Sequence, residues 1–310
     1  MTSPIQTPSH RRAGTPVPES VVALLDTLID YAGLFPPAGL GMAEVVRNYA
    51  AYQRGADAWA LARLVIPVAR LQEFESALAA LPEAERLGAR FPITALLGTD
   101  PVADLGAVCT FNERHVHGGP AILSLESRVG SGEQIARLRA AVPEEYDLFC
   151  ELPLGGDLTT LVCQVRAVGA SAKVRTGGLN AAEIPAPEAV LAFLSACATE
   201  GVAFKATAGL HHALRGDQPL TYAPDAPRDT LHGYCNLLLA AAVLWNERPT
   251  GEALTLLRLT GDQPMQTTDE RIVWGGVAVS REEISMARAE FAQAIGSCSF
   301  TEPLDEAPGA

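Results

Sequence analysis

Two stretches decide the fold of this chain, 172–178 (AKVRTGG) and 202–210 (VAFKATAGL). Each begins as a brief apolar strand that carries one lysine, Lys173 or Lys205, and continues into a turn that contains glycine. Residues 187–200, between the two stretches, have the amphipathic pattern of a single helix. Together these segments predict a strand–helix–strand unit.

The lysines are unusual because they lie in strands that are expected to be buried. The strands of such a unit are parallel neighbours covered by helices, so an inward-pointing lysine lies in a largely dry interior. An unpaired ammonium group there is costly. A single lysine could reach water at the end of its strand, but matching lysines on successive strands favour a functional pair.

The rest of the chain alternates between strand and helix in the same way. Eight strands are expected, each followed by a helical pattern: the segment around Asp30, 59–66, 92–97, 121–126, 148–152, the two lysine stretches, and 271–277. Eight such units predict an α/β fold, a single (β/α)8 TIM barrel with the lysines on strands six and seven. A doubly wound open sheet is the alternative, but no G-x-G-x-x-G follows the first strand.

The barrel is expected to span residues 19–299. It includes a helical insertion over 213–270, between strands seven and eight, because this connection is long for a minimal barrel. Residues 1–18 are rich in proline, serine and threonine and are expected to form a disordered tail, and 300–310 are expected to form a loose acidic tail. A long apolar helix in the insertion would suit the contact of a homodimer.

Composition limits the partners and the compartment. The formal net charge is −13, the pI is about 4.9, and no run of lysine or arginine occurs, so neither nucleic acid nor an anionic membrane is an expected partner. The six cysteines are scattered without C-x-x-C spacing, which is typical of free thiols in a reducing compartment. The apolar run 237–245 is too short to span a bilayer, so a cytoplasmic protein is expected.

The polar side chains of the lysine strands point one way. Strand alternation places Lys173 and Arg175 on one side of strand six, and Lys205 and Thr207 on one side of strand seven. If that side is the interior, like charge and burial both lower the pKa of a lysine. A shift from about 10.4 to about 7 corresponds to roughly 4–5 kcal/mol. The neutral amine would then attack a carbonyl carbon and form a Schiff base.

Carboxylates near the lysines are candidate acid–base groups. Glu126 and Glu151 end the predicted strands four and five, and either could move protons around a Schiff base. Asp30, near strand one, is a further carboxylate of the same kind. The alternative for each is an ion pair that only neutralises a lysine.

Four runs carry a resemblance to a known family: 150–158 (CELPLGGDL), 169–177 (GASAKVRTG), 202–210 and, more loosely, 273–280 (VWGGVAVS). They resemble deoxyribose-phosphate aldolase and its class I aldolase relatives over strands five to eight. The resemblance implies that Lys173 is the Schiff-base nucleophile and that Lys205 lowers its pKa. It further implies substrate contacts in the turns that follow the strands: Thr176, Gly177, Thr207, Gly275 and Gly276, the last two as a phosphate cradle.

The chain departs from this family in three places. The relatives carry an aspartate inside strand four as a proton relay, but 121–125 (AILSL) contains none, and Glu126 comes late in that strand. Arg175 stands where the relatives have a small hydroxyl residue, and its planar fork could bind a carboxylate or phosphate. His211 and His212 follow strand seven, where the relatives have glycines and an arginine. One of the histidines is expected to act as a general acid–base or as a hydrogen-bond donor to substrate. Alternatively, both could ligate a divalent metal together with Glu151 or Glu126.

Three hypotheses use this one pocket. The first is a lyase of the class I aldolase type that acts on a small, optionally anionic carbonyl compound through a lysine Schiff base, and it requires neither a cofactor nor a metal. The second is a metal-dependent lyase or hydrolase on the same barrel. The third is a barrel without catalytic activity that binds an anionic metabolite through Lys173, Arg175 and Lys205.

Overall fold

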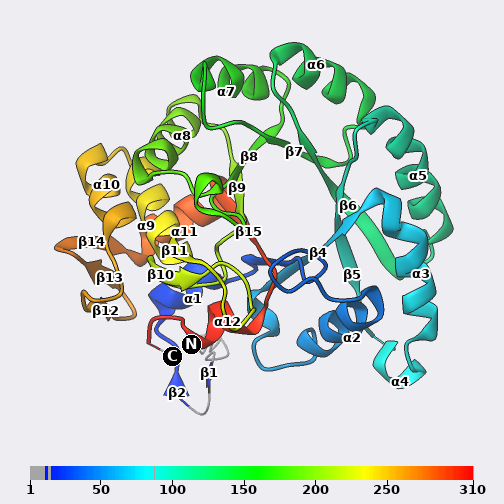
Figure 1. The fold of residues 1–310 in the computed structure, drawn as a ribbon, viewed down its shortest axis with the longest axis horizontal. Helices are drawn as coiled ribbons and strands as arrows, with labels where there is room; N and C mark the ends of the chain where they lie inside the picture. The colour runs from blue at the N-terminus through cyan, green and yellow to red at the C-terminus, as the bar shows by residue number, and fades with distance from the viewer. Residues whose placement is uncertain (1–10, 13–14, 87, 310) are drawn as a thin grey trace, which may run out of the picture.

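The structure, a computed structural model, describes residues 11–12, 15–86 and 88–309. A closed barrel of parallel strands lies at its centre (Figure 1), which confirms the predicted (β/α)8 TIM barrel. The barrel strands, in chain order, are β3 (Ile29–Tyr31), β4 (Leu61–Pro67), β5 (Phe91–Leu96), β6 (Pro120–Arg128), β7 (Asp147–Glu151), β8 (Ser171–Arg175), β9 (Phe204–Thr207) and β15 (Ala292–Ser297).

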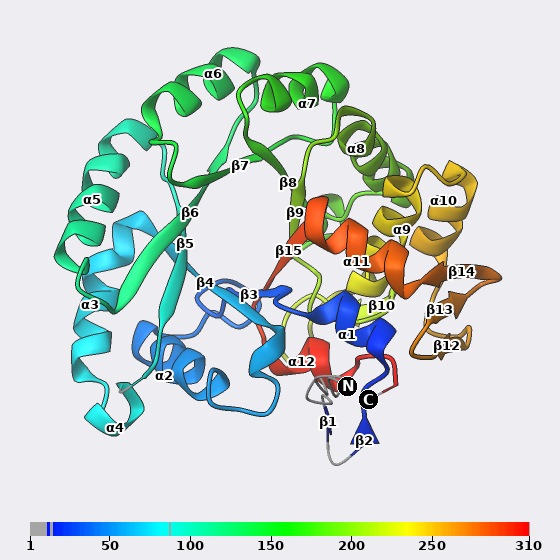
Figure 2. The same cartoon turned by 180° about the vertical axis from the view of Figure 1, so that it is seen from behind.

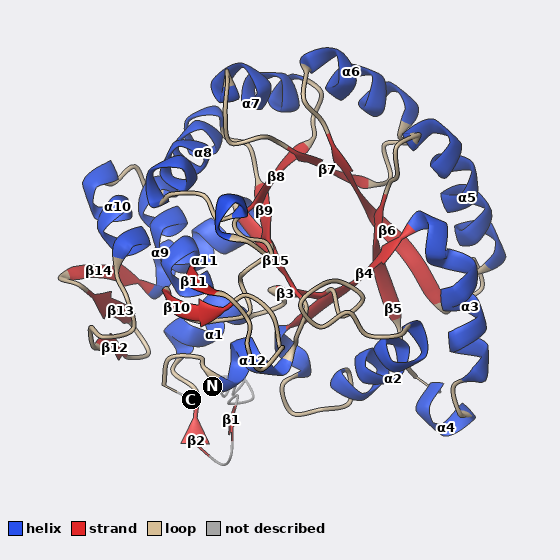
Figure 3. Ribbon diagram, viewed as in Figure 1, coloured by secondary structure: helices blue, strands red, loops and turns tan. Residues whose placement is uncertain are grey.

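Helices surround the barrel as an outer layer (Figure 3). Some begin at a side-chain cap; Ser131 accepts a hydrogen bond from the backbone N–H of Gln134, and Asp157 accepts one from that of Thr160. The layer consists of α2 (Met42–Tyr52), α3 (Leu71–Ala80), α5 (Pro101–Arg114), α6 (Gly132–Ala141), α7 (Leu158–Ala167), α8 (Pro187–Glu200), α9 (Tyr234–Trp245) and α11 (Arg281–Glu290). Smaller helices are α1 (Glu19–Leu25), α4 (Glu83–Arg86), α10 (Thr250–Arg258) and α12 (Thr301–Asp305).

The two lysine strands follow the predicted alternation. Val174 and Ala206 are completely buried in the apolar core under the helices. Their neighbours Lys173 and Lys205 therefore point to the opposite side, which is the interior of the barrel. The two lysines are also Cα partners in the pairing of β8 with β9, so they lie directly beside each other.

The last barrel strand is not where the sequence pattern predicts it. Residues 271–277 are expected as strand eight, but β13 (Arg271–Trp274) pairs antiparallel with β12 (Met265–Thr267) on one side and with β14 (Val277–Ser280) on the other, in a small sheet outside the barrel (Figure 2). The barrel is closed by β15, which lies between β9 and β3.

The failure of this prediction has a physical cause in β15 itself. Its sequence, AQAIGS, contains small residues at the positions that face the interior. Ala294 and Gly296 border the two cavities at opposite ends of the barrel, and a Cβ on Gly296 would lie 2.6 Å from Thr207 Oγ1. Apart from Ile295, the segment contains none of the β-branched and aromatic residues that are typical of a strand.

The segment 213–270 is only partly the helical insertion that is expected. It begins with a hairpin of β10 (Gly216–Pro219) and β11 (Arg228–Leu231). Helix α9 follows, and all its residues from Tyr234 to Leu244 are buried within this one chain. Burial in the monomer explains its apolar sequence, so α9 no longer supports a homodimer contact, and a homodimer stays a prediction.

The carboxyl-terminal segment is not the loose tail that is expected for 300–310. Residues 301–305 form α12, and Leu304 is only 1 % exposed. Glu306 accepts hydrogen bonds from the backbone N–H of Ala213 and pairs with His212. The prediction is wrong because apolar residues that lie between the acidic ones in the sequence, among them Leu304, are buried against the rest of the protein.

The amino-terminal tail expected over 1–18 lies largely outside the described residues. Residues 1–10 and 13–14 are among those that the structure does not describe. The described parts, β1 (Arg11–Arg12) and β2 (Thr15–Pro16), pair antiparallel.

One helical stretch of the described chain, Ala181–Glu200, is long and apolar enough to cross a membrane by length and composition alone. It includes α8, which packs beside α7, α9 and α10 in the helical layer. The stretch is therefore weak evidence of a membrane span.

Candidate active site

The carboxyl-terminal ends of the barrel strands surround a cavity of about 940 Å³. Active sites of (β/α)8 barrels lie at this end. Of the residues predicted for the site, the following border the cavity: Glu126, Glu151, Lys173, Arg175, Lys205, Thr207 and His211.

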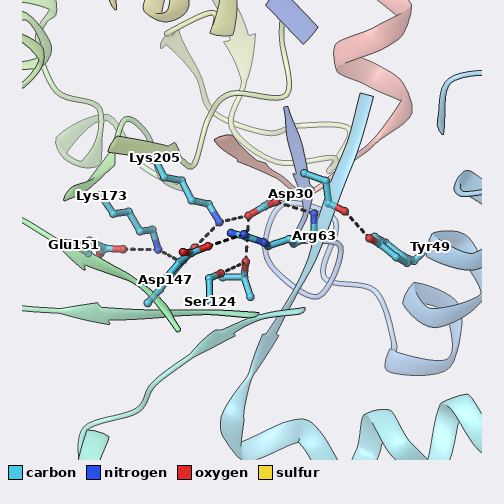
Figure 4. A network of polar contacts seen from close by, with 11 residues as sticks. Asp30, Tyr49, Arg63, Ser124, Asp147, Glu151, Lys173 and Lys205 are labelled. Carbon is cyan, nitrogen blue, oxygen red and sulfur yellow. Dashed lines mark hydrogen bonds and ion pairs between the residues drawn. The ribbon is translucent and has the colours of Figure 1, made fainter. Parts of the chain in front are cut away.

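A chain of ion pairs joins the two lysines at the floor of the cavity (Figure 4). Lys173 is 4 % exposed, and its Nζ donates to Glu126 Oε2 at 2.5 Å and lies 2.9 Å from Glu151 Oε2. Lys205 is 1 % exposed, and its Nζ donates to Asp30 Oδ2 and to Glu126 Oε1. Glu126 therefore bridges the lysines, with one oxygen on each.

The bridge determines the charge states of Glu126 and Lys205. Burial alone would raise the pKa of Glu126, but the ammonium groups of Lys173 and Lys205 outweigh it and lower that pKa to about 2. Burial alone would lower the pKa of Lys205, but Asp30 and Glu126 outweigh it and raise the pKa. The expected lowering by like charge is therefore wrong for Lys205, because a carboxylate lies between the two ammonium groups. Lys205 remains protonated at neutral pH.

Asp30 supports Lys205 from within the barrel rather than contacting the cavity. Its Oδ1 accepts the backbone N–H of Arg63 at 2.8 Å, and its Oδ2 accepts the hydroxyl of Thr94 at 3.3 Å. Thr94 is also hydrogen-bonded to Ser124 at 2.7 Å. Asp30 borders a second cavity, of about 1140 Å³, toward the opposite end of the barrel. Asp30 therefore has the position of a counter-ion to Lys205, and a role for it in acid–base chemistry or in contact with substrate stays a prediction.

Glu151 has different surroundings from Glu126. Its Oε1 accepts from Arg128 Nε at 2.8 Å, and its Oε2 faces Lys173. It stands at the end of β7, borders the cavity and contacts one lysine rather than two. Of the carboxylates around Lys173, Glu151 is the better placed to exchange a proton with both the lysine and a ligand.

Thr176 and Gly177 join the turns at the mouth instead of lining the cavity. Thr176 Oγ1 donates to the carbonyl of Ala208 at 2.8 Å. A Cβ on Gly177 would lie 3.0 Å from the Cα of Gly209, so the close approach of the two turns requires glycine there. Neither residue borders the cavity, and their contact with substrate stays a prediction.

Gly275 and Gly276 lie far from this site in the fold. They form the turn between β13 and β14, with φ of +58° and +81°. Two successive positive φ values are typical of a tight hairpin turn. The predicted phosphate cradle is therefore wrong, because these glycines belong to the sheet outside the barrel.

His211 and His212 have different surroundings. His211 borders the cavity and is 5 % exposed; burial, with a smaller effect of His212, lowers its pKa to about 4, so its ring is neutral at pH 7. His212 Nδ1 lies 2.8 Å from Glu306 Oε1 instead. Within the described parts of the chain, no group of three or more His, Cys, Asp or Glu side chains is arranged to hold a metal ion.

Some of the site is absent from the sequence prediction. Arg128 lies two residues beyond Glu126 on β6, so strand alternation alone could have placed it at the mouth. Leu220 and Leu231, which line the cavity from the β10–β11 hairpin, carried no such signal because their position depends on how the hairpin folds back over the barrel.

Comparisons of the chain with models of protein families, with curated proteins and with solved structures find no match. A barrel of this kind supports many different reactions. The function must therefore be argued from the residues of the cavity.

Proposed function

We propose that this barrel is a carbon–carbon lyase of the class I aldolase type, which acts on a carbonyl compound through a Schiff base on Lys173. One observation carries the proposal. Lys173 and Lys205 are the only two lysines in the chain, beside 21 arginines, and both are buried side by side at the floor of one cavity. Arginine supplies every other cationic side chain apart from histidine, including three at this cavity, whereas among these side chains lysine is the one that can provide a nucleophilic amine.

The surroundings of the lysines favour Lys173 as the nucleophile. Lys205 contacts Asp30 and Glu126, which raise its pKa, so it keeps its proton at neutral pH. Lys173 lies next to Glu151 at 2.9 Å, and this carboxylate can accept its proton. The low pKa of Glu126 keeps that group ionised, so it serves as a counter-ion instead of a proton carrier.

The residues of the site can carry each step of such a reaction. Glu151 takes a proton from Lys173, and the neutral amine attacks the carbonyl carbon. Glu151 returns the proton to the carbinolamine hydroxyl, which leaves as water and gives the iminium ion. A base, for which Glu151 is again placed, takes the proton of the β-hydroxyl group; the bond between the α- and β-carbons breaks, and its electron pair enters the iminium to form an enamine. Protonation of the enamine carbon and hydrolysis release the second carbonyl product and regenerate Lys173.

Reduction with borohydride tests the proposal. The protein is incubated with a panel of aldehydes and ketones and treated with sodium borohydride, which reduces an iminium ion to a stable secondary amine. Since the chain has only two lysines, the adduct can be located by intact mass and peptide mapping with little background. We expect one adduct on Lys173, and none on this segment in the variant Lys173→Met.

Two outcomes would contradict the proposal. An adduct confined to Lys205 would reverse the assignment of the lysines. The absence of an adduct on either lysine with every compound would exclude a Schiff-base enzyme for this panel, and would leave an anion-binding barrel as the better interpretation.

A further inference from the structure

The rim of the cavity contains a cation that pairs with none of the described residues. Arg175 follows Lys173 by two residues on β8 and borders the same cavity. Among the described residues, Arg175 has no hydrogen bond and no ion pair through its side chain. The other arginines of the cavity do have one, since Arg128 pairs with Glu151 and Arg137 pairs with Glu133.

One cation of the cavity has no partner among the described residues. Five cationic side chains border the cavity, and three carboxylates do. Asp30 pairs with Lys205 from below and Glu133 pairs with Arg137, so the charges balance overall. Lys173 and Lys205 are paired within the network and Arg128 pairs with Glu151, which leaves Arg175 as the unpaired cation. A guanidinium without a partner at the rim of a cavity can bind an anion.

The walls of the cavity are apolar. Leu210, at the end of the turn after β9, is completely buried, and Leu220 and Leu231 from the hairpin are nearly so. Phe35 and Val129 add apolar surface from other loops. A volume of about 940 Å³ is at the upper end of the range for ligand pockets, and far more than a triose needs.

We infer, on the basis of the proposed function, that the substrate is a carbonyl compound with a carboxylate group and an apolar body. The carboxylate binds Arg175, the carbonyl carbon lies at Lys173, and the apolar body packs against the leucines of the wall. Residues two apart on one side of a strand are separated by about 6.5 Å, which suits a carboxylate close to the carbonyl along the substrate chain. Carboxylate is favoured over phosphate because the glycine turn expected to cradle phosphate, Gly275 and Gly276, lies outside the barrel.

Matched probes test this inference. The charged probe is 2-oxo-4-phenylbutanoate, its neutral counterpart is the ethyl ester, pyruvate lacks the apolar body, and glyceraldehyde 3-phosphate carries phosphate instead of carboxylate. The measurement is the probe concentration that gives half-maximal borohydride adduct. In the wild-type protein we expect the acid to be effective at a concentration about 10- to 100-fold lower than the ester, because a charge-assisted hydrogen bond to Arg175 is lost in the ester. Pyruvate is expected to need at least a tenfold higher concentration than the longer acid.

Variants at the rim assign the effect to a residue. In Arg175→Gln the preference for the acid over the ester is expected to disappear. Arg137→Gln is the matched control, because that arginine also lies at the rim but already pairs with Glu133, and the preference is expected to persist. The inference is overturned if the ester equals the acid, if Arg175→Gln keeps the preference, or if glyceraldehyde 3-phosphate is the most effective probe.

A second measurement separates this inference from the proposed function. If no probe forms an adduct, the Schiff-base chemistry fails while anion binding stays testable with 4-phenylbutanoate, which has no ketone. Binding then predicts a rise in the melting temperature of the wild-type protein and of Arg137→Gln, but not of Arg175→Gln. An equal shift in all three proteins, or none, overturns the inference.

Discussion

Lys173 and Lys205 occupy paired positions on neighbouring strands, yet they have different surroundings. Lys205 is held by Asp30 and Glu126, and its pKa is raised. Lys173 contacts Glu126 and, at the edge of the cavity, Glu151. Each lysine contacts two carboxylates, and they differ in the one that they do not share: Asp30, inside the barrel, for Lys205, and Glu151, which borders the cavity, for Lys173. The comparison teaches that the carboxylates of other strands, and not the position on the strand, give the two lysines their different surroundings.

The largest effect is expected from removing the fixed cation. The change Lys205→Met leaves the buried carboxylates of Asp30 and Glu126 without one of their partners, and we expect the free energy of unfolding to fall by about 3–5 kcal/mol. Urea denaturation measures this loss. The double variant Lys205→Met/Asp30→Asn should regain part of it, because one of the unpaired charges is removed. A loss below about 1 kcal/mol would mean that Lys205 is not the structural member of the pair.

The next effect is kinetic and concerns the other lysine. In Glu151→Gln the proposed proton acceptor of Lys173 is lost, and we expect the rate of adduct formation to fall by about 100-fold. Unfolding in urea should change little, because Lys173 keeps its contact with Glu126. Glu126→Gln is the matched comparison, and it should reduce stability more than Glu151→Gln does, because Glu126 contacts both lysines. An unchanged rate in Glu151→Gln would remove this residue from the mechanism.

His211, in the wall of the cavity, and Glu126, at its floor, should lower the free energy of unfolding over different ranges of pH. The pKa of His211 is about 4 in the folded protein and about 6.5 in an unfolded chain. As the pH falls from about 6.5 to 4, the unfolded state binds this proton first, so the free energy of unfolding falls by about 3 kcal/mol. Glu126, with a folded pKa of about 2, adds a further loss only as the pH falls below about 4.3.

Urea denaturation at pH 7, 5.5 and 4 checks this prediction. In His211→Gln the loss between pH 6.5 and 4 should become smaller, while the loss at lower pH should remain. An identical pH dependence in the wild type and in the variant would show that His211 is not buried as a neutral ring.

The smallest effect concerns the turns that follow the two lysine strands. Thr176→Val removes the hydrogen bond to the carbonyl of Ala208, and we expect a loss of about 1 kcal/mol of unfolding free energy. Thr176→Ser keeps the hydroxyl and should retain more of the stability. If Thr176→Val abolished adduct formation without loss of stability, the hydroxyl would contact substrate after all.

Much of the fold can be predicted from local patterns. Strands β4 to β9 alternate with helices that have clear periodicity and caps, and the predicted helix over 187–200 coincides with α8. Strand β15 could not be identified because it has few strand-forming residues, while β13 shows the pattern of a strand but pairs in a separate sheet. Local pattern predicts that a segment is extended, whereas its partners are decided by packing.

The site is predictable to a similar extent. The lysines and Glu151 could be placed at the mouth because their strands and alternation were recognised. The charge states could not, since the position of Glu126 between Lys173 and Lys205 depends on how strands four, six and seven curve around the barrel. For Lys205, the neighbouring carboxylates Asp30 and Glu126 outweigh burial and raise the pKa that burial alone would lower.

The small residues of β15 have a consequence for the assembly of the barrel. Asp30 and Lys205 belong to the strands on either side of β15, and their ion pair crosses its inner face at Ala294 and Gly296. Larger side chains there would occupy the space that the two charged side chains need. The small residues of β15 thus match the ion pair between its two neighbouring strands, because Asp30 and Lys205 fill the space in front of Ala294 and Gly296.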